Sequence, residues 1–78
     1  MVLGLVLIKI KPHYEHTIYK KLAEIPQIVE YHPLFGEYDF IVKIETNTLE
    51  NLEDIVLNSI RNIQGIISTK TLTGPTFH

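Results

Sequence analysis

The chain has 78 residues, a net charge of −2, 45% hydrophobic residues and no cysteine. This length fits a single domain, residues 1–78, with a small core, because a short chain buries only about 60% of the surface that it exposes when unfolded. The lack of cysteine excludes disulfides, thiolate metal sites and thiol catalysis, which leaves self-association as a way to bury more surface. No basic run is longer than Lys20-Lys21, so no nucleic-acid footprint is visible. The apolar run at residues 2–8 is too short for a membrane span and lacks the flanks of a signal peptide, so we expect a soluble, cytoplasmic protein.

Residues 2–11 predict a strand that is rich in Val, Leu and Ile and that ends at Pro12. Both alternating sets of side chains in this strand are apolar, which is typical of a strand that is buried on both faces. Helices of the chain can cover one face, and something else must cover the other. The two sets are Leu3, Leu5 and Leu7 on one face and Val2, Val6, Ile8 and Ile10 on the other.

Residues 12–25 predict a helix, because apolar side chains recur there at spacings of three and four and Pro26 ends the pattern. Residues 27–34 predict a second strand. Pro33 cannot donate a ladder hydrogen bond, which indicates that this strand lies at a sheet edge or is bulged. After a turn, residues 38–46 predict a third strand.

The second helix is predicted to begin at Asn47, which has capping-box spacing with Glu50, or alternatively at Thr48. Gly65 is predicted to end this helix as a left-handed cap, and residues 66–73 predict the last strand. The apolar stripe of the helix consists of Leu49, Leu52, Ile55, Val56, Ile60 and Ile63.

The order strand, helix, strand, strand, helix, strand predicts an α+β fold, with residues 74–78 as a loose tail. Right-handed crossovers make this fold a ferredoxin-like βαββαβ sandwich with an antiparallel sheet and both helices on one face. The other face is then open. Because the first strand is apolar on that side too, we expect the open face to pack against a second copy of the chain, forming a dimer.

The most unusual chemistry of the sequence lies around the turn at residues 35–37. Gly36 permits a positive φ and close approach of backbone. Tyr38 offers an aromatic face with a hydroxyl at its edge, and Asp39 places a carboxylate where strand propensity disfavours it. Polar residues that are locally unfavourable, on a loop held by a rigid scaffold, are typical of a binding site.

This pattern resembles the RAM domain, the amino-acid-sensing half of the Lrp/AsnC (feast/famine) transcription regulators, and the resemblance covers nearly the whole chain. Family members usually carry a helix-turn-helix DNA-binding domain before the RAM domain. This chain begins at the first strand, so it resembles the stand-alone RAM proteins, and we expect no direct DNA binding. The residues that carry the resemblance are Gly36-Glu37-Tyr38-Asp39, Gly65-Ile66 and Thr69-x-Thr71.

The resemblance implies dimers that pack through their sheets and associate further into rings, often octamers. It also implies that a small effector, typically an amino acid, binds where dimers meet, and that no cofactor is needed. Gly36, Tyr38 and Asp39 would form one wall of this site, and Thr69 and Thr71 would supply hydroxyls. Asp39 could pair with the ammonium group of the amino acid, while hydroxyls and backbone N–H groups bind its carboxylate.

Simpler interpretations of the same residues remain open. Asp39 could cap backbone amides in an ordinary hairpin turn, with Tyr38 packed at an interface. Thr69 and Thr71 could reflect strand propensity alone. Full-length Lrp/AsnC-type regulators are then possible partners of a purely structural oligomerisation module.

An enzyme and a metal site are the remaining alternatives. Cofactor-free monooxygenases share this dimeric sandwich, but they would need a catalytic His or Asn in an enclosed cavity, and no catalytic pattern stands out. The ACT amino-acid-binding domain has the same element order, with its site at the first strand-to-helix loop. His13 and His16 have a chelating spacing, but a stable metal site usually needs three or four ligands. We therefore predict a non-enzymatic effector-binding and oligomerisation module of transcriptional regulation, without a metal.

Overall fold

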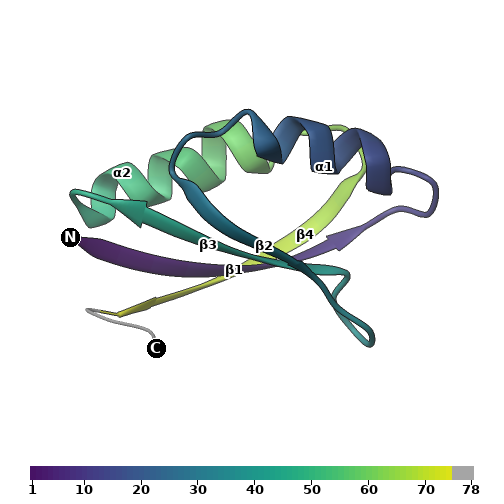
Figure 1. The fold of residues 1–78 in the computed structure, drawn as a ribbon, viewed down its shortest axis with the longest axis horizontal. Helices are drawn as coiled ribbons and strands as arrows, with labels where there is room; N and C mark the ends of the chain where they lie inside the picture. Colours follow the sequence, from purple (N-terminus) through teal and green to yellow (C-terminus); the bar gives the residue numbers. More distant parts are fainter. Residues whose placement is uncertain (75–78) are drawn as a thin grey trace.

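The computed structural model describes residues 1–74 as a four-stranded sheet with two helical segments on one side of it (Figure 1). The predicted tail falls largely outside the described residues, except that Gly74 ends the last strand. In chain order the elements are β1 (Val2–Ile10), α1 (Glu15–Ala23), β2 (Ile28–Pro33), β3 (Phe40–Thr46), α2 (Leu49–Asp54), the π-helical η1 (Ile55–Ile60) and β4 (Ile66–Gly74).

The strand order is β2-β3-β1-β4, and every neighbouring pair is antiparallel. The ferredoxin-like βαββαβ fold predicted from the sequence is thereby confirmed. The interpretation of Pro33 is confirmed as well, because β2 is an edge strand and its register with β3 is irregular between Ile28 and Glu30. The central strand β1 pairs with β3 on one side and with β4 on the other.

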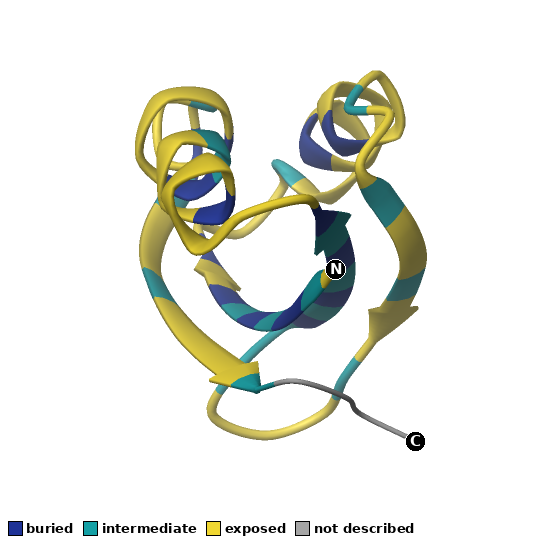
Figure 2. Cartoon of the chain, turned by 90° about the vertical axis from the view of Figure 1, so that its left-hand side faces the viewer, coloured by how far each residue is buried: buried dark blue, intermediate teal, exposed yellow. Residues whose placement is uncertain are grey.

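The core lies between the sheet and the helices. Figure 2 shows the buried residues gathered on the central strands and on the sides of the helices that face the sheet. Gly4 lets α2 approach the sheet closely, because a Cβ atom at this position would lie 2.8 Å from both Cδ atoms of Leu52. The core residues with 0% exposure are Val6, Ile8, Ile18, Val42, Ile44, Leu52 and Ile60.

The opposite face of the sheet is not covered by any helix of residues 1–74 (Figure 1). Leu3 on this face is nevertheless only 7% exposed, and Leu5 and Leu7 are half-buried by side chains of the adjacent strands. Leu72, which is opposite Leu5 in the β1–β4 ladder, remains 42% exposed. The apolar strip of β1 is therefore less open than the sequence alone suggests.

Charged side chains border this strip on β2 and β3. Lys43 Nζ lies 3.4 Å from Glu30 Oε2, and His32 Nε2 lies 3.1 Å from Glu30 Oε1. An apolar centre with a polar border is the usual anatomy of a protein–protein interface.

The first helix begins later than predicted, at Glu15 instead of Pro12. His13 has a φ of 75° and lies in the preceding turn, where the N–H of Tyr14 donates to the carbonyl of Lys11. The prediction that His13 and His16 share one helix is therefore wrong, because only His16 belongs to α1.

The second helix is not one continuous α-helix. Its N-cap is Thr48, whose Oγ1 accepts a hydrogen bond from the N–H of Asn51, so the alternative cap is confirmed over Asn47. From residue 55 the segment widens into η1, which the N–H of Arg61 closes by donating to the carbonyl of Val56. The amide side chain of Asn62 donates to the carbonyl of Asn58, an acceptor that a regular α-helix offers to the backbone four residues on.

Gly65 takes the left-handed conformation that was predicted, with a φ of 100°. The prediction that it ends the helix is wrong, because η1 ends at Ile60 and Gly65 directly precedes β4. A Cβ atom there would lie only 2.5 Å from the ring of Tyr14. The carbonyl of Gly65 also accepts a hydrogen bond from the N–H of Lys11 at 2.8 Å. This contact joins the residue just before β4 to the residue just after β1.

Candidate functional site

The turn between β2 and β3 carries the residues that the sequence singled out first. Gly36 has a φ of 117°, and nothing lies within 4 Å of the position that a Cβ atom would occupy. Beside it Phe35 is fully exposed, at 106%. The turn projects from the end of the sheet (Figure 1). The exposure of Phe35 places its aromatic side chain in solvent.

Asp39 ties this turn to the end of β1. Its Oδ2 accepts a hydrogen bond from the N–H of Ile10 at 2.8 Å, and its own N–H donates to the carbonyl of Ile8 at 2.9 Å. The carbonyl of Asp39 accepts from the N–H of Leu34 at 2.8 Å. The strand begins at Phe40, so Asp39 is not the first strand residue. One oxygen of its carboxylate thus has a structural role.

Thr69 and Thr71 lie in β4 opposite Ile8 and Val6, on the side of the sheet that faces the helices. Together they line a groove of about 430 Å³ between β4 and the second helical segment. We call it the α2–β4 groove. Its other lining residues are Leu49, Leu52, Glu53, Val56, Leu57, Arg61 and Thr73.

The predicted site residues therefore fall into two groups within one chain. Phe40 of β3, next to Asp39, pairs with Ile8 of the central strand β1, and Ile8 in turn pairs with Thr69 of β4. The two groups are therefore separated by two strand spacings of about 5 Å each. None of Gly36, Tyr38 and Asp39 lines the α2–β4 groove. A single copy does not bring all five residues to one pocket.

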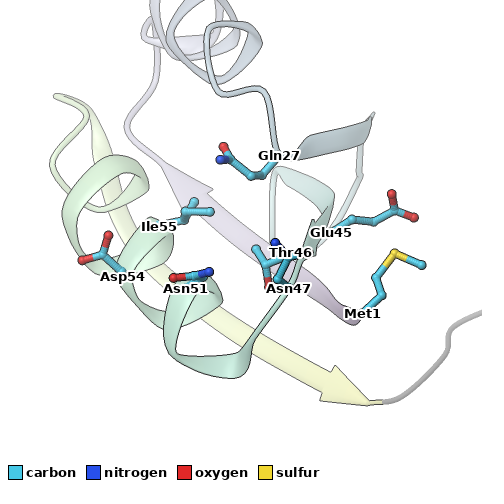
Figure 3. Close-up of a pocket in the computed structure, with 8 residues that line it drawn as sticks. All are labelled: Met1, Gln27, Glu45, Thr46, Asn47, Asn51, Asp54 and Ile55. Atoms are coloured by element: carbon cyan, nitrogen blue, oxygen red, sulfur yellow. The ribbon is translucent and has the colours of Figure 1, made fainter.

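A second, polar cleft of about 520 Å³ lies at the other end of the sheet from the β2–β3 turn (Figures 1 and 3). Gln27 lines it from the loop before β2, and Asn51 and Asp54 line it from α2. Thr46 at its floor is 7% exposed and donates its hydroxyl to the carbonyl of Thr48 at 2.8 Å. No pattern in the sequence predicted this cleft. The complete lining is Met1, Gln27, Glu45, Thr46, Asn47, Asn51, Asp54 and Ile55.

Two titratable groups on β2 have shifted pKa values, and they lie on opposite faces of the sheet. Burial raises the pKa of Tyr31 to about 12, and the nearby Tyr19, whose ring centre is 4.9 Å away, acts in the same direction. The contacts with His32 and Lys43 hold the pKa of Glu30 below its ordinary value. Neither group lines one of the two large grooves.

Arg61 lines the α2–β4 groove but was not among the site residues predicted from the sequence. It is the only arginine of the chain and lines the α2–β4 groove beside Thr69 and Thr71. Its signal in the sequence is its place four residues after Leu57, next to an otherwise apolar stripe. No carboxylate of residues 1–74 lies within ion-pair distance of its guanidinium.

Within residues 1–74 no three His, Asp or Glu side chains come together in a way that could hold a metal ion. None of the helices in this part of the chain combines the length and apolar character that a membrane crossing requires.

The strand order and the paired helical segments define a ferredoxin-like α+β domain. Within that class the chain belongs to the Lrp/AsnC ligand binding domain family, which matches residues 3–73. The family identified from the sequence is therefore confirmed, and it is a family of transcriptional regulators.

Two known proteins illustrate the relationship. The HTH-type transcriptional regulator FL11 of Pyrococcus furiosus is 35% identical over 71 residues, which are 91% of this chain and 46% of the regulator. The chain thus spans about half the length of this relative. The crystal structure of FFRP-DM1 is 34% identical, superimposes with a TM-score of 0.90, and is matched over 95% of this chain and 99% of that one.

A third relative is an enzyme. A homocitrate synthase of Sulfurisphaera tokodaii is 34% identical over 58 residues, which are 74% of this chain but only 12% of the enzyme. A segment of this kind therefore occurs within a much longer catalytic protein as well as within regulators.

Proposed function

We propose that this chain binds a small effector of the free amino-acid class and couples that binding to its assembly with other copies and with transcriptional regulators. The observation that carries the proposal is the family match, which covers residues 3–73 and corresponds to the ligand-binding part of the regulators. The domain acts by binding and not by catalysis.

Dimerisation through the open face of the sheet is the first step of the proposed assembly. The half-buried Leu5 and Leu7 and the exposed Leu72 supply an apolar centre, and the Lys43–Glu30 pair supplies part of a polar border. Complete burial of a leucine contributes roughly 1.5–3 kcal/mol, so a few such residues on each copy favour association.

The effector site is completed where dimers meet, with a ring of four dimers as the proposed assembly. Gly36, Tyr38 and Asp39 of one copy then approach Thr69 and Thr71 of another. The separation of these two groups within one chain supports a site shared between copies. The fully exposed Phe35 at the tip of the turn supports it too, because an isolated copy leaves this side chain in water.

Effector binding and DNA binding are separable in this proposal. The homocitrate synthase relative supports the separation, because a related segment lies within an enzyme. The net charge of −2 opposes contact with the phosphate backbone. Any association with DNA then occurs through a full-length Lrp/AsnC-type regulator.

A purely structural oligomerisation module is the second candidate. The hydrogen bond from the N–H of Ile10 to Asp39 Oδ2 favours it, since it gives the Asp39 carboxylate a role without any ligand.

Thermal-shift measurements with each of the twenty amino acids, combined with light scattering, separate the two candidates. We expect at least one amino acid to raise the melting temperature and to change the mass of the assembly. An assembly that is indifferent to all twenty would contradict effector binding and leave the structural module.

A further inference from the structure

We propose that the α2–β4 groove recognises the two charged ends of its ligand separately, with Arg61 binding the carboxylate and Glu53 binding the ammonium. The inference rests on the proposed function and adds two residues that the family pattern of Gly36, Asp39 and the threonines does not contain. The ligand class is an α-amino acid with an aliphatic side chain.

Arg61 is suited to a carboxylate by its chemistry and its surroundings. Its planar guanidinium can donate two parallel hydrogen bonds to the two oxygens of a carboxylate. It makes no ion pair with any carboxylate of residues 1–74, so the group is not already used within the chain. Lys70 does not compete for this role, because it alternates with Thr69 and Thr71 and lies on the open face of the sheet opposite Leu7.

The hydroxyls of the groove are placed to assist Arg61. Thr69, Thr71 and Thr73 follow one another at every second position of β4 and all line the groove. Side chains at such positions point to the same face and recur about every 7 Å along the strand. A ligand that lies along β4 therefore meets a row of hydroxyls, each of which can donate to an oxygen or accept from an ammonium.

The helical wall of the groove is apolar. Leu49 is 48% exposed and Leu57 is 53% exposed, while Leu52 and Val56 beneath them are buried. Half-exposed leucines beside charged groups offer an aliphatic ligand side chain a surface to cover. The groove volume of about 430 Å³ lies within the range of about 300–1,000 Å³ typical of small-molecule sites.

Glu53 and Arg61 lie eight residues apart on the helical wall of the groove, and the π-helical turn brings both onto the side that faces the groove. Eight residues of α-helix rise about 12 Å, a separation that the long side chains of Glu and Arg can close from both ends. In an uninterrupted α-helix Arg61 would lie about 80° around the axis from Glu53. Because η1 uses more residues per turn, it reduces this angle, and both residues line the same groove. A π-bulge beside a functional site is a common association.

Isothermal titration calorimetry of the assembled protein tests this inference with L-leucine and its 2-oxo analogue, 4-methyl-2-oxopentanoate, in which a carbonyl oxygen replaces the ammonium group while the carboxylate and the aliphatic side chain are kept. We expect Arg61→Gln to lower the affinity for both compounds by roughly ten- to a hundredfold, as the loss of a charge-assisted hydrogen bond does. Glu53→Gln should lower the affinity for L-leucine alone, so that the affinities for the two compounds become more similar. Lys21→Gln removes a positive charge from the exposed side of α1, outside the groove, and should leave both affinities unchanged.

The outcomes separate this inference from the proposed function. If L-leucine binds Arg61→Gln as it binds the wild type, the inference is overturned while effector binding stands. If wild-type protein binds a polar amino acid and not L-leucine, the aliphatic ligand class is wrong. If Arg61→Gln breaks the assembly in light scattering and spares the affinity, the groove is a contact between copies and the inference is again overturned. If no amino acid binds the wild type, it is the proposed function that fails.

Discussion

The two faces of the sheet are both apolar along β1, but they differ in what completes them. On the covered face Ile8 is 0% exposed, because α1, α2 and η1 close over it. On the open face Leu7 is only half-buried, although it directly precedes Ile8 in the chain. The covered face is finished within one copy, whereas the leucines of the open face stay partly exposed in a single copy. Under the proposed dimerisation a second copy would bury them, and one strand would then contribute to both folding and association.

Truncating neighbouring side chains on the two faces tests the difference between them most directly. We expect Ile8→Ala to lower the free energy of unfolding by about 2–5 kcal/mol, because it leaves a cavity in a closed core. Leu7→Ala serves as the matched control and should cost clearly less in the dissociated chain. Urea denaturation at low protein concentration measures both values, and equal losses would contradict the difference between the faces.

The complementary test charges the open face. We expect Leu5→Lys to disperse the proposed dimer, because pairing the faces would then bury an ammonium group without a partner. A single copy should remain folded, since Leu5 lies outside the core closed by the helices. Light scattering reports the mass and circular dichroism reports the fold. An assembly of unchanged mass would show that another surface holds the copies together.

Tyr31 probes the covered face at alkaline pH. Its pKa is raised to about 12 by burial, so between pH 10 and 12 the unfolded chain loses this proton before the folded chain does. Stability supplied by the neutral phenol is therefore complete below pH 10 and is lost as the pH rises through the folded pKa. We expect the denaturation midpoint of the wild type to fall more steeply over this range than that of Tyr31→Phe. Parallel curves would rule out the burial of this hydroxyl.

The smallest expected effect on stability comes from Glu30, which precedes Tyr31 in the chain and lies on the open face. It is measured at acid pH. Its pKa is lowered by His32 and Lys43, so its contribution is present above the ordinary glutamate pKa of about 4.3 and is lost as the pH falls through the lower folded value. The difference in midpoint between wild type and Glu30→Gln should therefore shrink in acid. Because the pair is exposed, 1 M salt should shrink it as well. A difference that is independent of pH and salt would assign the effect to something other than charge.

The sequence predicted the fold well because its signals are local or periodic. Spacings of three and four along the helices, Pro33 in an edge strand, and the left-handed Gly65 all follow from the neighbours of each residue. The α2–β4 groove and the polar cleft were not predictable in this way, because each joins residues from elements that are distant in the chain. The π-helical turn escaped prediction because the apolar spacing of three and four does not distinguish it from a regular α-helix, and the Asn62 side-chain bond to the carbonyl of Asn58 that accompanies it is a three-dimensional contact.

The motif around Asp39 shows the limit of the sequence for the site itself. Its residue types indicated polar chemistry at a turn, and the turn is where they predicted it. Whether a carboxylate faces a ligand or a backbone amide depends on which strand end lies beside it, and here the N–H of Ile10 does. Ligand binding by Gly36, Tyr38, Asp39, Thr69 and Thr71 stays a prediction.

The position of β4 beside β1 also determines the order in which the domain can be completed. Every pairing in the β1–β4 ladder joins residues near opposite ends of the described chain, such as Val6 with Thr71. A chain that emerges N-terminus first carries the whole apolar β1 strand long before its second partner exists. Contacts of such high sequence separation slow folding, and an unpaired apolar strand is prone to aggregate in the meantime. The same central position that makes β1 the most protected strand of the finished domain makes it the most vulnerable one during synthesis.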